Sequence, residues 1–185
     1  MNKILSTVLS AAVIASMAGC STPAASKTSS TGEGKTSVVA EDGTKSEGVM
    51  TYAEYVDAAV DSEVTVETYV QAKQGWWEDK GVGKATLYTQ GQEGAYFLYD
   101  VEMSEEDYNK LTEGTKIKAV GYKSEWSGEV EITDATFEIE EGNYIAEPVD
   151  LTDMLANEDE LIKHQNEKFS VKGLTVSASK DADGK

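Results

Sequence analysis

The chain has 185 residues, enough for one domain of ordinary size or two small ones, and its formal net charge at pH 7 is −18. All 16 of its basic residues are lysine, so the sequence lacks arginine, the usual bidentate reader of phosphate and guanine. A chain with a large negative net charge repels nucleic-acid backbones and anionic lipid surfaces, which disfavours nucleic acid as its natural ligand.

The first 19 residues have the features of an export signal. Lys3 supplies a positive charge, residues 4–14 form an apolar stretch too short to span a bilayer, and small residues precede Cys20. Residues 17–20, Met-Ala-Gly-Cys, resemble the lipobox of bacterial lipoproteins. This resemblance implies cleavage before Cys20 and acylation, for example by palmitate, of that cysteine. We therefore expect a protein anchored to the cell membrane by lipid, facing the extracytoplasmic side.

The alternative is a plain secretory signal with an incidental cysteine. It would leave Cys20, the only cysteine of the chain, as an unpaired thiol. Residues 20–48 follow, rich in Ser, Thr, Gly, Ala, Lys and Glu and poor in large apolar residues. Such a composition buries too little surface to fold, and we expect a disordered tether.

Residues 49–147 have the pattern of a small β domain. Thr51 and Glu54 form a capping box ahead of a short amphipathic helix, and Ser104 caps a second helix that stops at Gly114. Five runs rich in β-branched and aromatic residues are expected strands: 64–70, 85–88, 96–99, 116–122 and 130–139. Residues 123–128 are expected to join the last two strands. After the first helix, the expected order is β-β-β-α-β-β.

This order resembles the OB-fold, a five-stranded, partly open Greek-key barrel. Residues 111–121 (LTEGTKIKAVG) are similar to the helix end, glycine and alternating strand that lead into the fourth strand of many bacterial OB domains, especially acidic ones exported to the envelope. The expected fold class is therefore mainly β with short helices, built on an OB-fold-like barrel. Another small β-barrel or a sandwich is the alternative.

Residues 148–185 are expected to contain a helix and then a strand beginning at residue 169. Residues 169–176 echo residues 64–70, and each run follows a capped helical stretch. One interpretation is that the sequence stops at Lys185 inside a second OB-like unit. The other is that this helix and strand pack on the first barrel and complete it.

Aromatic residues are the candidate ligand contacts. The OB resemblance implies a ligand face over the second and third strands, bordered by the loop after strand one and the loop between strands four and five. All three tryptophans fall in those loops and three tyrosines in the strands between: Trp76, Trp77, Trp126, Tyr88, Tyr96 and Tyr99. Flat rings stack on sugars or bases, and the acidic chain favours a glycan or a protein partner.

In the alternative, the tryptophans cap the core. Neighbouring side chains on an extended segment point to opposite sides, so at most one of Trp76 and Trp77 is expected to face inward. The sequence contains no catalytic motif. His164, the only histidine, reads as a solvated helix residue, and residues 181–184 read as a turn rather than a calcium loop.

We therefore expect neither catalysis nor a metal or cofactor. The expected function is that of a lipid-anchored, non-catalytic module that binds a glycan or a protein partner. Two alternatives remain: an accessory or targeting region of a longer extracellular enzyme whose catalytic domain follows Lys185, and an OB-type nucleic-acid-binding domain.

Overall fold

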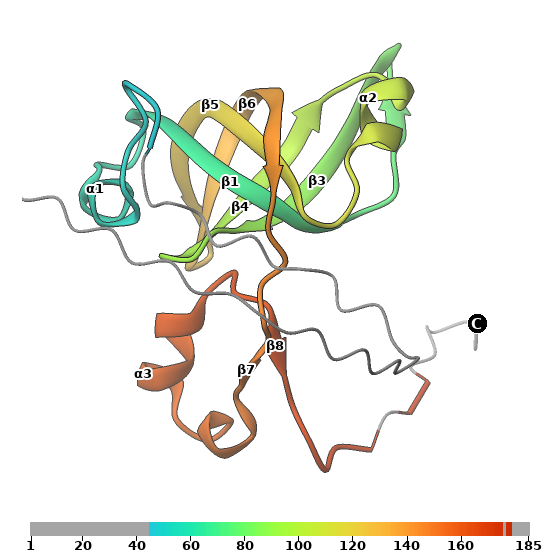
Figure 1. Ribbon diagram of the computed structural model, residues 1–185. Helices are drawn as coiled ribbons and strands as arrows, with labels where there is room; N and C mark the ends of the chain where they lie inside the picture. The colour runs from blue at the N-terminus through green and yellow to red at the C-terminus, as the bar shows by residue number, and fades with distance from the viewer. Residues whose placement is uncertain (1–44, 176, 179–185) are drawn as a thin grey trace, which may run out of the picture. The chain divides into compact units, whose positions relative to one another are not determined.

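The computed structural model describes residues 45–175 and 177–178 (Figure 1). The export signal, Cys20, the tether up to residue 44 and the turn at residues 181–184 lie outside the described residues. The described helices are all too short, or too polar, to cross a membrane.

The described part of the chain is mainly β with a few short helices (Figure 1). In chain order its main elements are α1 (Tyr52–Asp57), β1 (Glu63–Lys73), β2 (Trp77–Asp79), β3 (Val82–Gln90), β4 (Ala95–Glu102), α2 (Glu105–Lys110), β5 (Thr115–Trp126) and β6 (Glu129–Asn143). The strands form a six-stranded sheet in the order β1-β5-β6-β4-β3-β2, and β1 also pairs with β3. All these pairings are antiparallel except that of β4 with β6.

The five expected strands all lie within observed strands, and the two expected helices are present. There are two differences from expectation. The short strand β2 falls in the expected loop after the first strand, where it pairs with β3. Residues 123–128 are not a loop, because β5 continues to Trp126 and turns at Ser127 and Gly128, whose φ angles are 52° and 90°. Positive φ at both positions matches the tight hairpin turn that suits twisted strands.

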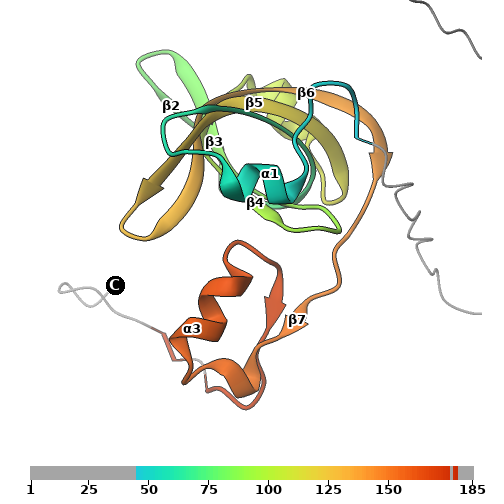
Figure 2. The ribbon, with the colours of Figure 1, turned by 90° about the vertical axis from the view of Figure 1, so that its left-hand side faces the viewer.

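The alternating apolar side chains of the strands pack into one continuous core. Its fully buried side chains include Val66, Leu87, Leu98, Ile117 and Ile132, one from each long strand. Tyr55 of α1 belongs to the same core, so α1 covers one end of the curved sheet, as Figure 2 shows. The helix is held at its N-terminus by the expected capping box of Thr51 and Glu54.

The end of the expected tether is in contact with the sheet. The backbone nitrogen of Ser46 donates to the Glu67 carboxylate at 3.2 Å, and Lys45 Nζ donates to the Glu67 carbonyl oxygen at 3.3 Å. Residues 45–48 are therefore attached to the folded domain. The β1 residue that they contact is more than 20 positions away in the sequence. Composition does not indicate such a contact, so the predicted tether ended too late, at residue 48.

After β6 the chain forms a short segment with little regular structure. It comprises β7 (Val149–Asp150), the 3₁₀ turn η1 (Thr152–Met154), α3 (Glu158–Leu161), the 3₁₀ turn η2 (Ile162–His164) and β8 (Phe169–Ser170). The expected strand over 169–176 is limited to Phe169 and Ser170, which pair in parallel with β7. The two strands form a separate two-stranded sheet, which no further strand of the described residues joins.

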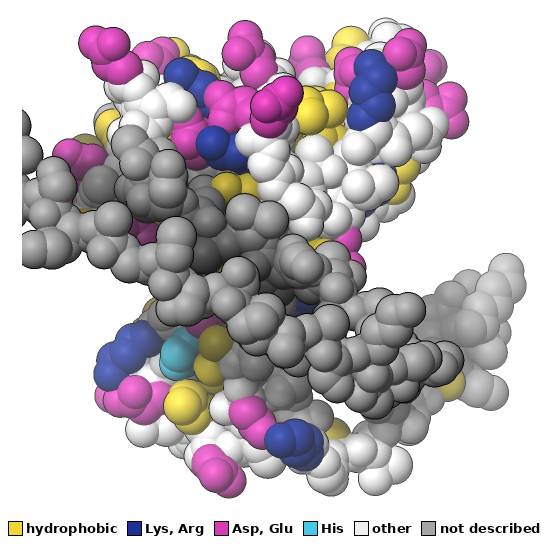
Figure 3. All heavy atoms as spheres, viewed as in Figure 1, with side chains coloured by type: hydrophobic (Ala, Val, Ile, Leu, Met, Phe, Trp, Pro, Cys, Tyr) yellow, Lys and Arg dark blue, Asp and Glu magenta, His cyan; other side chains and the backbone are white. Residues whose placement is uncertain are grey.

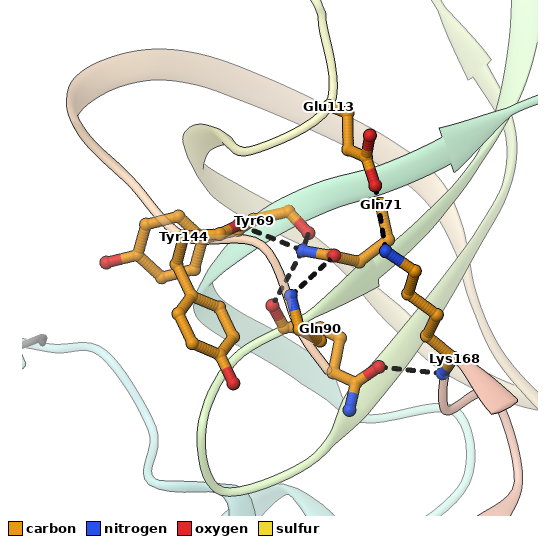
Figure 4. A network of polar contacts seen from close by, with 7 residues as sticks. Tyr69, Gln71, Gln90, Glu113, Tyr144 and Lys168 are labelled. Carbon is orange, nitrogen blue, oxygen red and sulfur yellow. Dashed lines mark hydrogen bonds and ion pairs between the residues drawn. The ribbon is translucent and has the colours of Figure 1, made fainter. Parts of the chain in front are cut away.

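Polar contacts join this segment to the sheet (Figure 4). The Gln71 amide nitrogen donates to the carbonyl oxygen of Tyr144 at 3.1 Å, and its amide oxygen accepts from the backbone of Ala146 at 2.9 Å. Further on, the backbone nitrogen of Lys168 donates to the Gln90 side chain at 2.7 Å. These contacts favour the interpretation that the segment completes the first domain.

Candidate functional site

A pocket of about 530 Å³ lies on the outer face of the sheet, where β3 and β4 meet the β5–β6 hairpin. It is lined by Tyr88, Phe97, Tyr99, Trp126, Glu129, Glu131 and Asn166. Three of the six predicted ligand contacts, Tyr88, Tyr99 and Trp126, thus share one pocket although 38 positions separate the first from the last in the sequence.

Strand alternation forms the aromatic wall of the pocket. On β4, Leu98 points into the core, so its neighbours Phe97 and Tyr99 point to the opposite face. Tyr88 on β3 is the register partner of Phe97, and directly paired side chains stand on the same face of a sheet. The ring centroids of Tyr88 and Phe97 are 5.2 Å apart, and those of Phe97 and Tyr99 are 6.2 Å apart. The three rings form a row across two strands.

The β5–β6 hairpin supplies the opposite wall. Trp126 pairs with Glu129 next to the turn, and Ser124 pairs with Glu131 two positions further along. These side chains therefore share one face of the hairpin. Trp126 is 73% exposed, the largest exposed fraction among the large hydrophobic side chains described. An indole left so open at the rim of a pocket is available to a ligand.

Glu131 is the unusual residue of this wall, because it is an acidic residue with only 8% of its surface exposed. Burial raises its pKa, and the nearby charges of Glu129 and Asp100 raise it further. Within the part of the chain that the structure describes, no lysine or hydrogen-bond donor counters this rise. Partial burial without a positive partner makes a carboxylate more costly to ionise, and groups with shifted pKa values gather at functional sites.

The segment after β6 closes one side of the pocket. The Asn166 amide donates to the carbonyl oxygen of Val130 at 3.1 Å. The Gln165 side chain accepts from the Val130 backbone nitrogen at 3.1 Å and donates to the Gly128 carbonyl oxygen at 2.8 Å. Figure 2 shows the hairpin turn facing the segment that carries α3. Asn166 has a φ of 66°, a conformation that asparagine tolerates better than most residues.

The other three predicted contacts lie elsewhere. Tyr96 is 2% exposed and packs edge-on against Tyr55 in the core, because it precedes Phe97 and so points to the opposite face. The prediction that Tyr96 contacts a ligand is therefore wrong, because its ring is buried in the core. Trp76 packs against the core, and its indole nitrogen donates to the Met103 carbonyl oxygen at 3.2 Å, so this ring has a structural role. Trp77 is 41% exposed and points outward, as alternation predicted, but it lies outside the pocket, where Lys84 Nζ is 5.9 Å from its ring.

Four lining residues were not among the predicted contacts. Phe97 could have been found, because it alternates with Tyr99 in the same run. Glu129 and Glu131 also alternate, but nothing in an acidic sequence distinguishes them from other glutamates. Asn166 carries no local signal, since it reaches the pocket through contacts made 36 positions away along the chain.

A second hollow of about 640 Å³ adjoins the first and shares Tyr88, Glu129 and Asn166 with it. It lies between the sheet and the segment after β6. His164 lines it, half-buried, with its Nδ1 2.8 Å from the Glu167 carboxylate. His164 is thus more enclosed than the sequence indicated, and its ring is held by a neighbour on its own segment.

Comparison with protein-family models, curated proteins and solved structures gives no match for this chain. Among the described residues, no group of three or more His, Cys, Asp or Glu side chains is arranged to hold a metal ion. Acidic side chains are interspersed with lysines over the sheet surface in view in Figure 3. The aromatic pocket is therefore the feature on which a functional proposal rests.

Proposed function

We propose that this protein is a non-catalytic binding module of the OB type, lipid-anchored through Cys20 on the extracytoplasmic side of the membrane. Its ligand, a glycan or an exposed part of a protein partner, sits in the aromatic pocket. The observation that carries the proposal is the convergence of Tyr88, Phe97, Tyr99 and the exposed Trp126 on one pocket. Stacked rings contribute roughly 1–3 kcal/mol each to binding of a flat ligand surface.

The strand pairing supports the OB part of this proposal. A small barrel requires that the pairings return to the first strand. Here β1 pairs with β5 and also with β3, while β4 pairs with β6, so the pairings run through all five long strands and back to β1. The helix α2 lies between the third and fourth of these strands in the sequence. The pocket lies over β3 and β4, which correspond to the second and third strands, the ligand face of OB domains.

Titration of the full chain with neutral oligosaccharides, with peptides and with single-stranded DNA at physiological salt tests this function. Tryptophan fluorescence is the readout, and we expect a saturable change with a glycan or a peptide. Trp126→Ala should abolish that change. Trp77→Ala is the matched control, since it removes an exposed tryptophan outside the pocket. Ligand-dependent changes that persist in Trp126→Ala, or a response to DNA alone, would refute the proposal.

A further inference from the structure

The charged side chains that line the aromatic pocket are both acidic. Glu129 and Glu131 line it, and Asp100 is near enough to influence Glu131. None of the described lysines is among its lining residues. Anionic groups, such as the phosphates of nucleic acid or of a lipid head group, meet only repulsion at such a site.

Glu131 differs from Glu67, the other buried glutamate among the described residues. Glu67 is also buried, and burial alone would raise its pKa, but bonds from Ser46 and Lys116 outweigh that effect and lower it. Lys116 Nζ lies 3.1 Å from the Glu67 carboxylate. The fold therefore supplies partners for the buried carboxylate that has a structural role. Glu131 has no such partner among the described residues and faces the pocket instead.

We infer that the pocket binds a cationic amine, whose ammonium group lies against the aromatic rings and faces the carboxylates of Glu129 and Glu131. This inference rests on the binding function proposed above and names the chemistry of its ligand. The faces of aromatic rings carry negative electrostatic potential and attract cations, most strongly where water is excluded. Here the rings combine with Glu131, a mostly buried residue that lines the pocket and has no positive partner among the described residues.

An organic cation fits this pocket better than a metal ion. Calcium takes six to eight oxygen ligands, whereas most of the lining here is aromatic. The volume of about 530 Å³ is also within the range of pockets for small molecules. An ammonium group could be presented by a lysine side chain of a protein partner or by an amino sugar, and both carry the same chemistry.

Matched pairs of probes that differ in charge test the inference. Calorimetry on the full chain, at constant ionic strength and pH 7, compares choline with its neutral isostere 3,3-dimethyl-1-butanol. We expect choline to bind at least about tenfold more tightly. A lysine peptide against its acetyl-lysine form, and a glucosamine oligomer against its N-acetylated form, then distinguish a protein source from a glycan source.

Variants test whether the difference in affinity between choline and its neutral isostere arises at the aromatic pocket. Glu131→Gln keeps the side-chain shape and should remove most of the advantage of choline, while Glu138→Gln, an exposed change on the same strand, should preserve it. Glu129→Gln provides a second variant should Glu131→Gln alter the fold. Equal affinity for both members of every pair would overturn the inference, yet leave the binding function standing if that affinity still depends on Trp126. No binding of choline at concentrations where the neutral probes bind would overturn it as well.

Discussion

The ammonium nitrogen of Lys123 donates to the carbonyl oxygen of Tyr55 at 3.0 Å and lies 5.2 Å from the centroid of the Tyr55 ring. It also donates to the carbonyl oxygens of Val56 and Ala58, at 2.7 and 2.8 Å. A charge on β5, only 7% exposed, thus satisfies backbone acceptors at the C-terminal end of α1. The contact fixes α1 over the end of the core.

Replacing this lysine should destabilise the domain. Lys123→Met keeps most of the apolar volume but removes the ammonium donor from three carbonyl oxygens, of which only that of Tyr55 keeps a second donor, the Ala58 nitrogen. We expect the free energy of unfolding to fall by about 2–4 kcal/mol. Urea denaturation measures the change. Lys118→Met is the control on the same strand, because the Lys118 side chain makes no hydrogen bond or ion pair among the described residues. Equal effects of the two variants would contradict the role given to Lys123.

Gly83 is required by the packing of Trp76. A Cβ at Gly83 would lie 2.5 Å from the Trp76 ring and 2.6 Å from the Met103 carbonyl oxygen. Gly83→Ala should therefore lower the free energy of unfolding by about 1–3 kcal/mol, the usual range for overpacking. Gly91→Ala, where a Cβ meets nothing within 4 Å, is the matched control. A neutral Gly83→Ala would show that Trp76 is free to move away.

Glu131→Gln should stabilise the protein at neutral pH. The pKa of Glu131 is raised by burial, and then by Glu129 and Asp100, so folding favours its protonated form. The stability that this form contributes is complete below the unfolded-state pKa and is lost as pH rises through the folded-state pKa. Denaturation curves should therefore coincide with those of the unmutated protein below about pH 4, and show a more stable variant at pH 7. A variant that is less stable at pH 7 would mean that Glu131 has a stabilising partner.

The Gln165 side chain should protect one particular amide from solvent. Its amide oxygen accepts from the backbone nitrogen of Val130. In Gln165→Ala we expect hydrogen exchange at Val130 to accelerate by at least about tenfold, since exchange follows local opening, with little change at Ile132 in the core. Gln92→Ala, at an exposed turn, is the control. Unchanged exchange at Val130 would indicate that the segment after β6 is held by other contacts.

Cys20 should carry the membrane anchor. Metabolic labelling with a fatty-acid analogue should modify the unmutated protein, and Cys20→Ser should abolish the label and leave an unprocessed precursor. More than one acyl chain is needed for stable retention, so membrane fractionation should show loss of the variant from the membrane. Labelling that persists in Cys20→Ser would place the lipid on another residue.

Local patterns in the sequence predicted the helices and strands that depend on neighbouring residues. Alternating apolar residues located the five long strands. The side-chain caps at Thr51 and Ser104 located the two helices that begin directly after them, α1 and α2. These signals are local, because strand periodicity and helix capping involve residues a few positions apart. Tyr88, Tyr99 and Trp126 were predicted as ligand contacts from the OB resemblance, as aromatic residues on the strands and in the loop that it implies.

Which aromatic rings meet depends on the pairing of strands that are distant in the sequence. The residue pairs between strands decide which face of β4 is outward, and they put Phe97 rather than Tyr96 beside Tyr88. The burial of Glu131 likewise depends on β4 and on the β5–β6 hairpin around it. The acidic sequence around Glu131 does not indicate either contact. The sequence gives the charge of a residue, and strand alternation predicts the face of the strand on which its side chain lies. The environment on that side comes from segments distant in the chain, and here those segments bury most of Glu131 and place it in the wall of the pocket.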